Sequence, residues 1–208
     1  MTTSTRPPRR SQQQRRATTV TKLIAATITS LSECGYQGTS VREICTRADL
    51  SPGAMFRQFT DRRELLVATV ADIVEHELTT FRVLIASLGS ATGVLPRNSG
   101  KLRAGHSATR ITALHEVLIA ARTDSELSAA LGPVMRGFYT TLLADEECAD
   151  VLGRFPEPVR EAVILTILDT FAGRAALGST AYTRAEVDKA VLDVTYGMLR
   201  AYLHTAAA

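Results

Sequence analysis

Few side chains in this 208-residue sequence stand at spacings that acid–base or metal chemistry requires. His115, Glu116 and Asp169 have apolar neighbours, but they form no H-E-x-x-H pair and no other set of ligands. The sequence also contains no G-x-S-x-G motif, no phosphate-binding loop and no dinucleotide-binding fingerprint. It therefore predicts a protein that is not an enzyme and that uses no cofactor and no metal.

The three cysteines also suggest no site. Cys34, Cys45 and Cys148 are odd in number, widely spaced and without a C-x-x-C pair, which disfavours a disulfide framework and a cysteine zinc site. They predict a reducing compartment, the cytoplasm. No apolar run approaches the roughly eighteen residues of a membrane-spanning helix, so we expect no membrane partner. Residues 1–32 lack acids, as targeting peptides do, but Lys22 and the helical spacing described below disfavour that alternative.

Charge is distributed unevenly along the chain. Residues 1–63 carry eleven Lys and Arg against four Asp and Glu, a net charge of +7, whereas residues 64–208 carry a net charge of −4. Such asymmetry predicts a polyanionic partner, most often nucleic acid, at the N-terminal end. A solvated basic tail is the alternative that charge alone leaves open.

The elements that must position these charges read as helices, so we expect an all-α fold. Residues 1–16 have almost no apolar side chain, which predicts a disordered basic arm. Residues 20–31 place apolar side chains at a helical period, and Gly35 should end that helix. A Gly- and Ser-rich loop is expected at 89–105. Further helices are expected at 107–122, 124–152 with a kink at Gly132-Pro133, 157–177 and 183–204.

Two capping-box patterns occur in and at the end of the basic region, residues 1–63. Ser40 with Glu43, and Asp61 with Glu64, match the pattern in which the first side chain accepts from the N3 N–H group while the acid returns to the N-cap N–H. They predict a short helix and a long helix, respectively. Residues 51–59 between them read either as a Pro-Gly turn or as a second short helix capped by its first serine. In that helix three side chains would face inward: Met55, Phe56 and Phe59.

A helix, a glycine turn, a short capped helix, a three-residue turn and a second short helix together make a helix-turn-helix. The second short helix can lie in a DNA major groove, because Gly53 and Ala54 let its backbone approach the bases. The chain also carries the run G-Y-x-G-T-S-V-x-x-I-C-x-x-A-x-L-S-P-G-A-M-F-R-x-F-x-x-R-x-x-L-L. On this run, residues 20–66 resemble the N-terminal DNA-binding domain of the TetR family of bacterial transcription regulators.

The resemblance implies a homodimer. Each subunit would join a helix-turn-helix domain, residues 17–63, to a larger helical domain, residues 64–208, that binds an effector and dimerises. The implied DNA contacts are Thr39, Ser40, Arg42, Ser51, Pro52, Gly53, Ala54, Phe56, Arg57 and Arg62. Arg62 stands where the family usually has a phosphate-contacting lysine. Phe56 replaces a common tyrosine, so either a phosphate contact is lost or the ring serves packing, and Gln58 replaces a frequent histidine or aromatic residue.

Simpler roles stay open for some of these residues. Helix capping accounts for Thr39, Ser40 and Ser51 without DNA, and Arg42 is adequately explained as a solvated side chain. The arginines of the N-terminal arm either contact the minor groove or phosphates, or belong to an idle tail.

The family's effector domains imply a mostly apolar pocket among the long helices, with ordinary core packing as the alternative. The candidate ligand-binding residues are Phe81, Leu84, Leu88, His115, Leu118, Met135, Phe138, Tyr139, Leu142 and Phe171. The predicted function is a repressor that a small hydrophobic effector releases from a near-palindromic operator in double-stranded DNA, through a population shift. A transcriptional activator of the same family, or a helical interaction module without DNA binding, are the alternatives.

The last two expected helices carry more apolar surface than one-sided packing needs. In residues 183–204 the polar side chains form one narrow strip, and residues 157–177 show a similar excess with small residues that permit close helix approach. Two such helices from each subunit predict a four-helix bundle around a two-fold axis, and a monomer that buries both is the alternative. The predicted interface residues are Val159, Ala162, Val163, Thr166, Gly173, Val187, Val191, Val194 and Met198.

Overall fold

The computed structural model describes residues 12–89, 108–178 and 185–206, and its elements within these ranges are all helices. The all-α prediction is confirmed. The helices are α1 (Gln12–Gly38), α2 (Val41–Ala48), α3 (Pro52–Phe56), α4 (Arg62–Gly89), α6 (Ala108–Ala121), α7 (Ser125–Ala144), α8 (Glu146–Gly153), α9 (Glu157–Gly178) and α10 (Ala185–Ala206). The predicted loop at 89–105 lies, beyond Gly89, outside the described residues.

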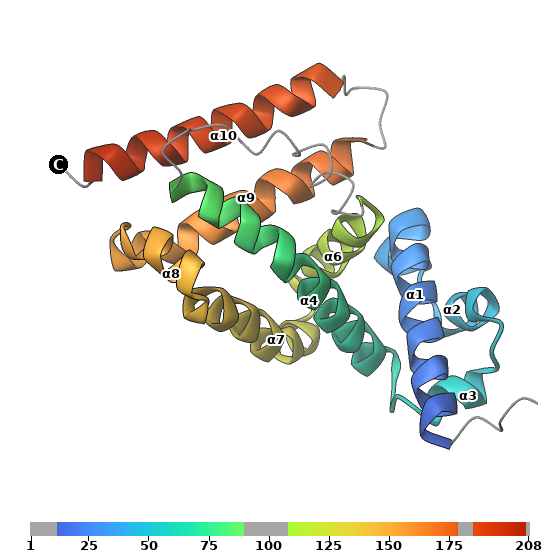
Figure 1. Ribbon diagram of the computed structural model, residues 1–208. Coiled ribbons are helices and arrows are strands. Elements are labelled where there is room, and N and C mark those ends of the chain that lie inside the picture. The colour runs from blue at the N-terminus through green and yellow to red at the C-terminus, as the bar shows by residue number, and fades with distance from the viewer. Residues whose placement is uncertain (1–11, 90–107, 179–184, 207–208) are drawn as a thin grey trace, which may run out of the picture.

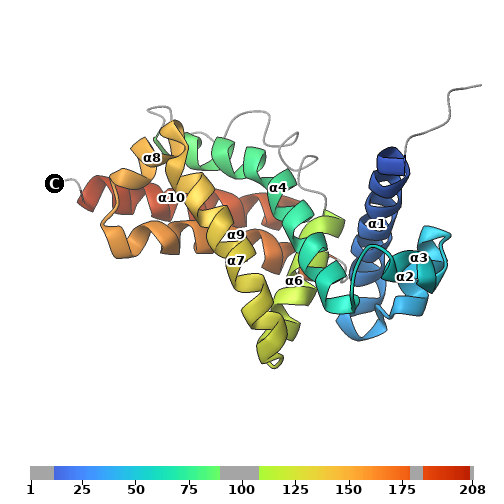
Figure 2. The same ribbon diagram turned by 90° about the horizontal axis from the view of Figure 1, so that it is seen from below.

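The helices divide between two ends of the molecule. Figure 1 shows α1, α2 and α3 gathered at one end, with α9 and α10 at the other and α4 running between them. The view from below in Figure 2 shows the same separation, with α6 beside α1. The most extensive contacts of α1 are in fact with α6, so the two ends meet along this helix pair.

The first helix begins earlier than composition predicts. Residues 12–16 belong to α1, so the expected disordered arm is wrong for them, and residues 1–11 lie outside the described part of the chain. Gln and Arg have good helix propensity and extend a helix that the apolar stripe further along has nucleated. Arg16 also gains a tertiary contact, because its Nε donates to Oε1 of Gln58 at 3.2 Å.

Gly35 interrupts α1, as predicted. Its φ of 69° and ψ of 178° are not helical, and a positive φ favours glycine because a Cβ would be strained there. One further turn follows to Gly38 before α2 begins.

The expected N-caps are present at all three helix starts. Side-chain oxygens of Ser40, Ser51 and Asp61 accept from the backbone N–H groups three residues later, at 3.1, 3.2 and 2.8 Å. Residues 51–59 thus contain the short helix α3 rather than only a Pro-Gly turn. Since α3 is a single turn and a half, its cap contributes much of what holds it in shape.

The return halves of the two capping boxes differ from the prediction. Glu43 accepts from Nε of Arg47 at 2.6 Å, because an arginine one turn later offers a charged donor. Glu64 accepts from the backbone N–H and the hydroxyl of Thr60, at 2.5 and 2.7 Å. These two donations lower the pKa of the Glu64 carboxyl below its ordinary value.

Helix α4 belongs to both ends of the molecule. Its 28 residues make a rod about 42 Å long. Leu65 packs in a small apolar cluster with α1, α2 and α3, while its neighbour Leu66 packs in the large cluster of the other helices. The buried members of the small cluster are Leu23, Ala26, Ile44, Cys45, Ala48, Met55, Phe59 and Leu65.

The single helix predicted for residues 124–152 is two helices in the structure, α7 and α8. The expected kink at Gly132-Pro133 leaves α7 continuous, and the chain breaks instead at Asp145. Asp145 adopts an extended conformation and its side chain accepts from the backbone N–H of Cys148 at 3.2 Å, which starts α8. Pro133 lies inside α7 without ending it, although a proline removes one helix hydrogen bond. The N-cap at Asp145, in contrast, does mark a boundary, because its side chain starts a new helix.

Candidate nucleic-acid interface

The turn between α2 and α3 is held by backbone hydrogen bonds. Asp49 adopts a left-handed conformation, with φ 54° and ψ 50°, and its N–H bonds to Thr46 O at 3.3 Å. Leu50 N bonds to Cys45 O at 3.0 Å, so the end of α2 is closed. The turn therefore fixes the direction in which α3 leaves.

Helix α3 has one buried side and one exposed side. Met55 is completely buried and Phe59 nearly so, which anchors the helix on the small cluster. The candidate contact residues on its other side are accessible: Ser51, Pro52, Gly53, Phe56 and Arg57 are exposed, and Ala54 is half-buried. Phe56 is 53% exposed, so its expected inward orientation, and with it a packing role, is wrong.

Gly53 is not required by the protein's own packing. A Cβ placed on it would meet nothing closer than Ser51 Oγ, at 3.9 Å, and its φ is not in the left-handed region. The fold itself therefore has room for a side chain at this position.

Thr39 does not reach the surface, which corrects its predicted role as a DNA contact. The residue is 0% exposed, and its hydroxyl donates to Gly35 O at 2.7 Å and accepts from Ser30 Oγ at 3.0 Å. The hydroxyl thereby satisfies the interrupted end of α1. Ser40 and Arg42 next to it are exposed, as a surface contact requires.

Arg62 is held by acceptors of the protein itself, and the phosphate contact expected of it stays a prediction. Its Nε donates to Thr39 O at 2.7 Å and its Nη2 donates to Tyr36 O at 2.6 Å. The guanidinium also lies 4.3 Å from the centre of the Tyr36 ring, a cation–π contact. A forked cation at the carbonyl end of a helix satisfies acceptors that the helix leaves open, so Arg62 fastens α4 to the end of α1.

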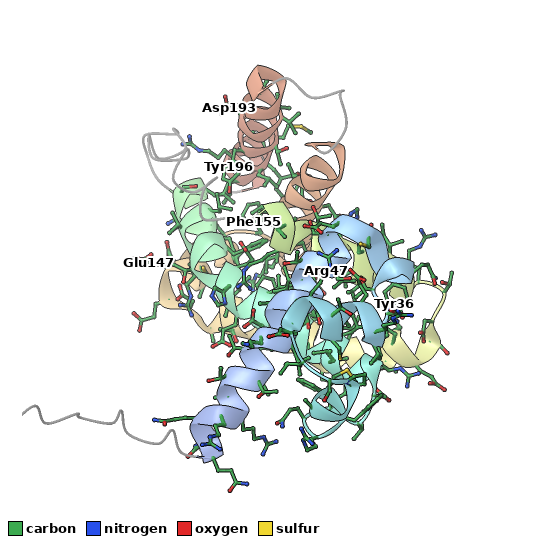
Figure 3. The ribbon with its side chains drawn as sticks, turned by 90° about the vertical axis from the view of Figure 1, so that its right-hand side faces the viewer. Tyr36, Arg47, Glu147, Phe155, Asp193 and Tyr196 are labelled. Atoms are coloured by element: carbon green, nitrogen blue, oxygen red, sulfur yellow. The ribbon has the colours of Figure 1, made fainter. Side chains whose placement is uncertain are left out.

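Arg47 is likewise held by the protein. Its guanidinium lies between Glu33, 2.5 Å away, and Glu43, and these two carboxylates raise the pKa of Arg47. Figure 3 shows Tyr36 and Arg47 together on the α1–α2 side of the molecule, far from Asp193 and Tyr196 on α10. Arg42 and Arg57 are exposed as well, and neither forms an ion pair with a carboxylate among the described residues.

Glu116 connects α6 to α1, a role that the sequence did not indicate. From α6 it reaches across to α1, where its Oε2 accepts from the backbone N–H of Tyr36 at 3.0 Å. A Cβ on Gly35 would lie 3.1 Å from that same oxygen. The carboxylate thus sits in the notch that the glycine leaves in α1. Eighty residues separate the two groups, so no local pattern could have paired them.

The candidate ligand-binding residues do come together, as part of the large apolar cluster. Phe81 packs edge-on against Phe138, with ring centres 5.3 Å apart, and Phe138 contacts Tyr139. Burial raises the pKa of Tyr139 to about 12, and the nearby Glu161 and Asp169 add to it. Leu84, Leu88 and Leu142 are buried in the same cluster, Leu118 and Met135 pack against it, and His115 is half-buried, while the Phe171 side chain lies outside the described residues.

The predicted interface helices expose an apolar face. Along α10, Val191, Val194, Met198 and Tyr202 are 40 to 69% exposed. Between α10 and α9 lies an apolar groove of about 340 Å³. Its lining includes Val159, Ala162, Val163, Thr166 and Met198 from the predicted interface. Val163 is a correction within this set, because at 1% exposure it belongs to the chain's own core. Gly173 is half-buried, and the side chain of Val187 lies outside the described part of α10.

The described ranges contain neither a candidate membrane-spanning helix nor a candidate metal site. No helix there is both long and apolar enough to cross a membrane. Among the same residues no three His, Cys, Asp or Glu side chains gather closely enough to hold a metal ion.

Comparison with known sequences places this geometry among DNA-binding proteins. A sequence model of the family described as bacterial regulatory proteins, tetR family, matches residues 23–75, which contain α2, α3 and the intervening turn. Helix-turn-helix-type transcriptional regulators from Mycobacterium bovis and Mycobacterium tuberculosis are each 30% identical to the chain over 158 residues. The aligned part covers 76% of this chain and 80% of each relative.

Solved structures share the fold along nearly the whole chain. A transcriptional regulator from a Rhodococcus species matches with a TM-score of 0.63 at 24% identity, covering 91% of this chain and 98% of that one. The multidrug binding protein EbrR, solved in complex with imidazole, matches with a TM-score of 0.58 at 19% identity, covering 90% and 93%. At these identities the likeness is evidence of the fold alone.

Proposed function

Since the chain belongs to the TetR family of bacterial regulatory proteins, it is a transcriptional regulator with a DNA-binding helix-turn-helix, and we propose that it is a repressor. In this proposal a homodimer in the cytoplasm occupies a near-palindromic operator through residues 17–63 of each subunit. Residues 64–208 dimerise and take up a small hydrophobic effector that releases the DNA.

The exposed side of α3 is the observation that carries the proposal. Its anchor, Met55, is buried, so the helix is presented firmly, while Pro52, Gly53 and Arg57 stay accessible. A glycine that the fold does not need allows close approach to bases. Arg57 can pair with guanine or phosphate, and the exposed ring of Phe56 is suited to apolar contact with a thymine methyl group.

The apolar face of α9 and α10 supports the dimer. Met198 and Val194 are the most exposed large apolar side chains of the described residues, at 69 and 61%. Exposed apolar surface of this kind marks an interaction site in a soluble protein. A two-fold axis through this face would pair α9 and α10 with their copies and set two α3 helices toward successive major grooves, about 34–36 Å apart or somewhat more.

The effector is proposed to bind among α4, α6 and α7. Phe81, Phe138 and Tyr139 supply aromatic surface there, and the Tyr139 hydroxyl adds a hydrogen-bond donor. EbrR, which shares this fold, is a multidrug binding protein, and this supports the binding of small molecules in this region. Helix α6 borders the proposed site through Leu118 and contacts α1 through Glu116. A shift of α6 on effector binding would therefore also move α1 at the DNA-binding end.

The proposal is tested with a library of random 40-base-pair duplexes. Wild-type protein should enrich sequences with two inverted half-sites, and a mobility shift should show one dimer for each duplex. An enriched sequence placed across a promoter in a purified transcription reaction should reduce transcript. A rise in transcript would instead identify an activator, and failure to enrich any duplex would refute DNA-specific function altogether.

A further inference from the structure

A second basic surface lies beside the exposed side of α3. The first turns of α1 and the end of α3 enclose a broad groove of about 930 Å³, called here the α1–α3 groove. Its lining residues are Gln12, Gln13, Arg15, Arg16, Thr19, Ala54, Arg57 and Gln58.

The groove is one-sided in charge. Among the residues that the structure describes, three arginines line it and no acidic residue does, and residues 12–32 contain no Asp or Glu at all. Like charges gathered on one surface repel each other unless an anion lies between them. The remaining polar side chains, glutamines and a threonine, add neutral hydrogen-bond donors. This set of donors fits phosphate oxygens, the commonest partners of Arg, Gln and Thr side chains on DNA.

The arginines of the groove are held in place relative to α3. Arg15 and Arg16 stand on a formed helix, and the bond from Arg16 to Gln58 ties that helix to the residues that follow α3. Further along α1, Leu23 packs in the same small cluster as Met55. The two helices therefore present their charges in one fixed arrangement.

The groove is also continuous with the candidate DNA-contacting surface. Ala54 and Arg57 belong to both. A duplex seated on α3 would thus pass directly in front of the groove, whereas an unrelated anion site would have no reason to share these residues.

We propose that the α1–α3 groove binds the sugar–phosphate backbone of duplex DNA next to the bases that α3 reads, with Arg15 and Arg16 as phosphate-binding residues. The inference rests on the proposed function and extends it, because these contacts lie outside the helix-turn-helix. Phosphate contacts fix the position of the protein and strengthen binding without selecting sequence. The groove should therefore lengthen the footprint and leave the preferred bases unchanged.

The test uses a duplex that the wild-type protein has enriched from the random library. Binding is measured by fluorescence anisotropy at several KCl concentrations for wild type, for the double variant Arg15→Gln/Arg16→Gln, and for Arg15→Gln alone, which keeps the Arg16–Gln58 bond. Each lost phosphate contact should make the slope of log K against log [KCl] shallower by about 0.9. Because both subunits of the dimer carry each substitution, the expected change is about 1.8 for Arg15→Gln and about 3.6 for the double variant. Arg154→Gln, at the C-cap of α8, is the control for Arg15→Gln, with the same change of charge and no expected change of slope. Figure 1 shows α8 at the end of the molecule away from α1 and α3.

A hydroxyl-radical footprint locates the contacts. The double variant should lose protection only at sugars next to the bases that α3 reads, and a second library selection should return the wild-type sequence preference. Unchanged slope and footprint in a double variant whose thermal melt matches wild type would overturn the groove proposal alone. If wild type enriches no duplex, the groove proposal falls together with the proposed function.

Discussion

The two ends of this molecule are stabilised in different ways. Around α2 and α3, a small apolar cluster is combined with side-chain caps from Ser40, Ser51 and Asp61 and with the Arg62 fork. Around α7, α9 and α10, long helices are held by a cluster more than twice as large. A short helix presented to a partner needs an exactly fixed direction, which caps and hydrogen bonds supply. A region that takes up a ligand needs adaptable apolar packing instead.

The largest effect is expected from removing the anchor of the small cluster. Met55→Ala should cost about 2–5 kcal/mol at a fully buried site. Because the cluster is small, α3 should lose its position, and DNA binding should be lost while the protein stays dimeric. Amide hydrogen exchange should rise in α2 and α3 selectively.

The matched variant is Leu142→Ala, equally buried in the large cluster. It should lower the melting temperature by a similar amount but leave DNA binding intact at 25 °C, because the remaining contacts hold the helices. If Leu142→Ala abolished DNA binding as completely as Met55→Ala, the two ends would not differ in the way described.

The apolar face of α10 gives the next largest effect. Val194→Asp should place an unpaired charge in the proposed dimer interface, which costs about 3–5 kcal/mol and weakens the dimer at least 100-fold. Sedimentation velocity should show a soluble monomer that binds an enriched duplex poorly. Val83→Asp, at another exposed valine on α4, should leave the dimer in place. A dimer that survives Val194→Asp would move the interface elsewhere.

The contact between the two ends can be measured by a double-mutant cycle. Gly35→Ala should lower the free energy of unfolding by about 1–2 kcal/mol. The backbone at residue 35 has a positive φ that alanine adopts only with strain, and the new Cβ would lie 3.1 Å from Glu116 Oε2. Glu116→Ala removes both that crowding and the bond to Tyr36 N. The two changes together should therefore cost less than the sum of the single changes in urea denaturation. Strict additivity would show that the notch does not join the ends.

The smallest effect concerns acid. The pKa of Glu64 is lowered in the folded protein because Thr60 donates two hydrogen bonds to the carboxylate. A lowered pKa stabilises the fold above the ordinary Glu value of 4.5, and the contribution is lost as the pH falls toward and through the folded-state pKa. Wild type should thus be more stable than Glu64→Gln at pH 7. In thermal melts the difference should begin to shrink as the pH falls below the ordinary value of 4.5, and it should disappear below the folded-state pKa. A difference that does not change with pH would refute the assignment.

Sequence predicts those parts of the structure that depend on neighbours along the chain. Ser51 and Asp61 bond to N–H groups three residues away, so their spacing alone identified them. Arg62 and Glu116 bond to backbone groups 23 and 80 residues away, and Thr39 accepts from Ser30, nine residues away, so no local spacing indicated these partners. Phe56 was misplaced for a related reason, because which side of a five-residue helix is buried depends on the helix it packs against.

The sharing of α4 between two cores limits how the protein can be divided for engineering. Leu65 completes the small cluster and Leu66 belongs to the large one, so no cut in the chain separates them cleanly. A fragment ending at residue 63 would keep Met55 but lose Leu65, which covers the same cluster. A hybrid regulator made by joining this DNA-binding end to another protein's effector region should therefore carry the first turns of α4 with it. Its effector region must also offer an acceptor to Tyr36 N, as Glu116 does here.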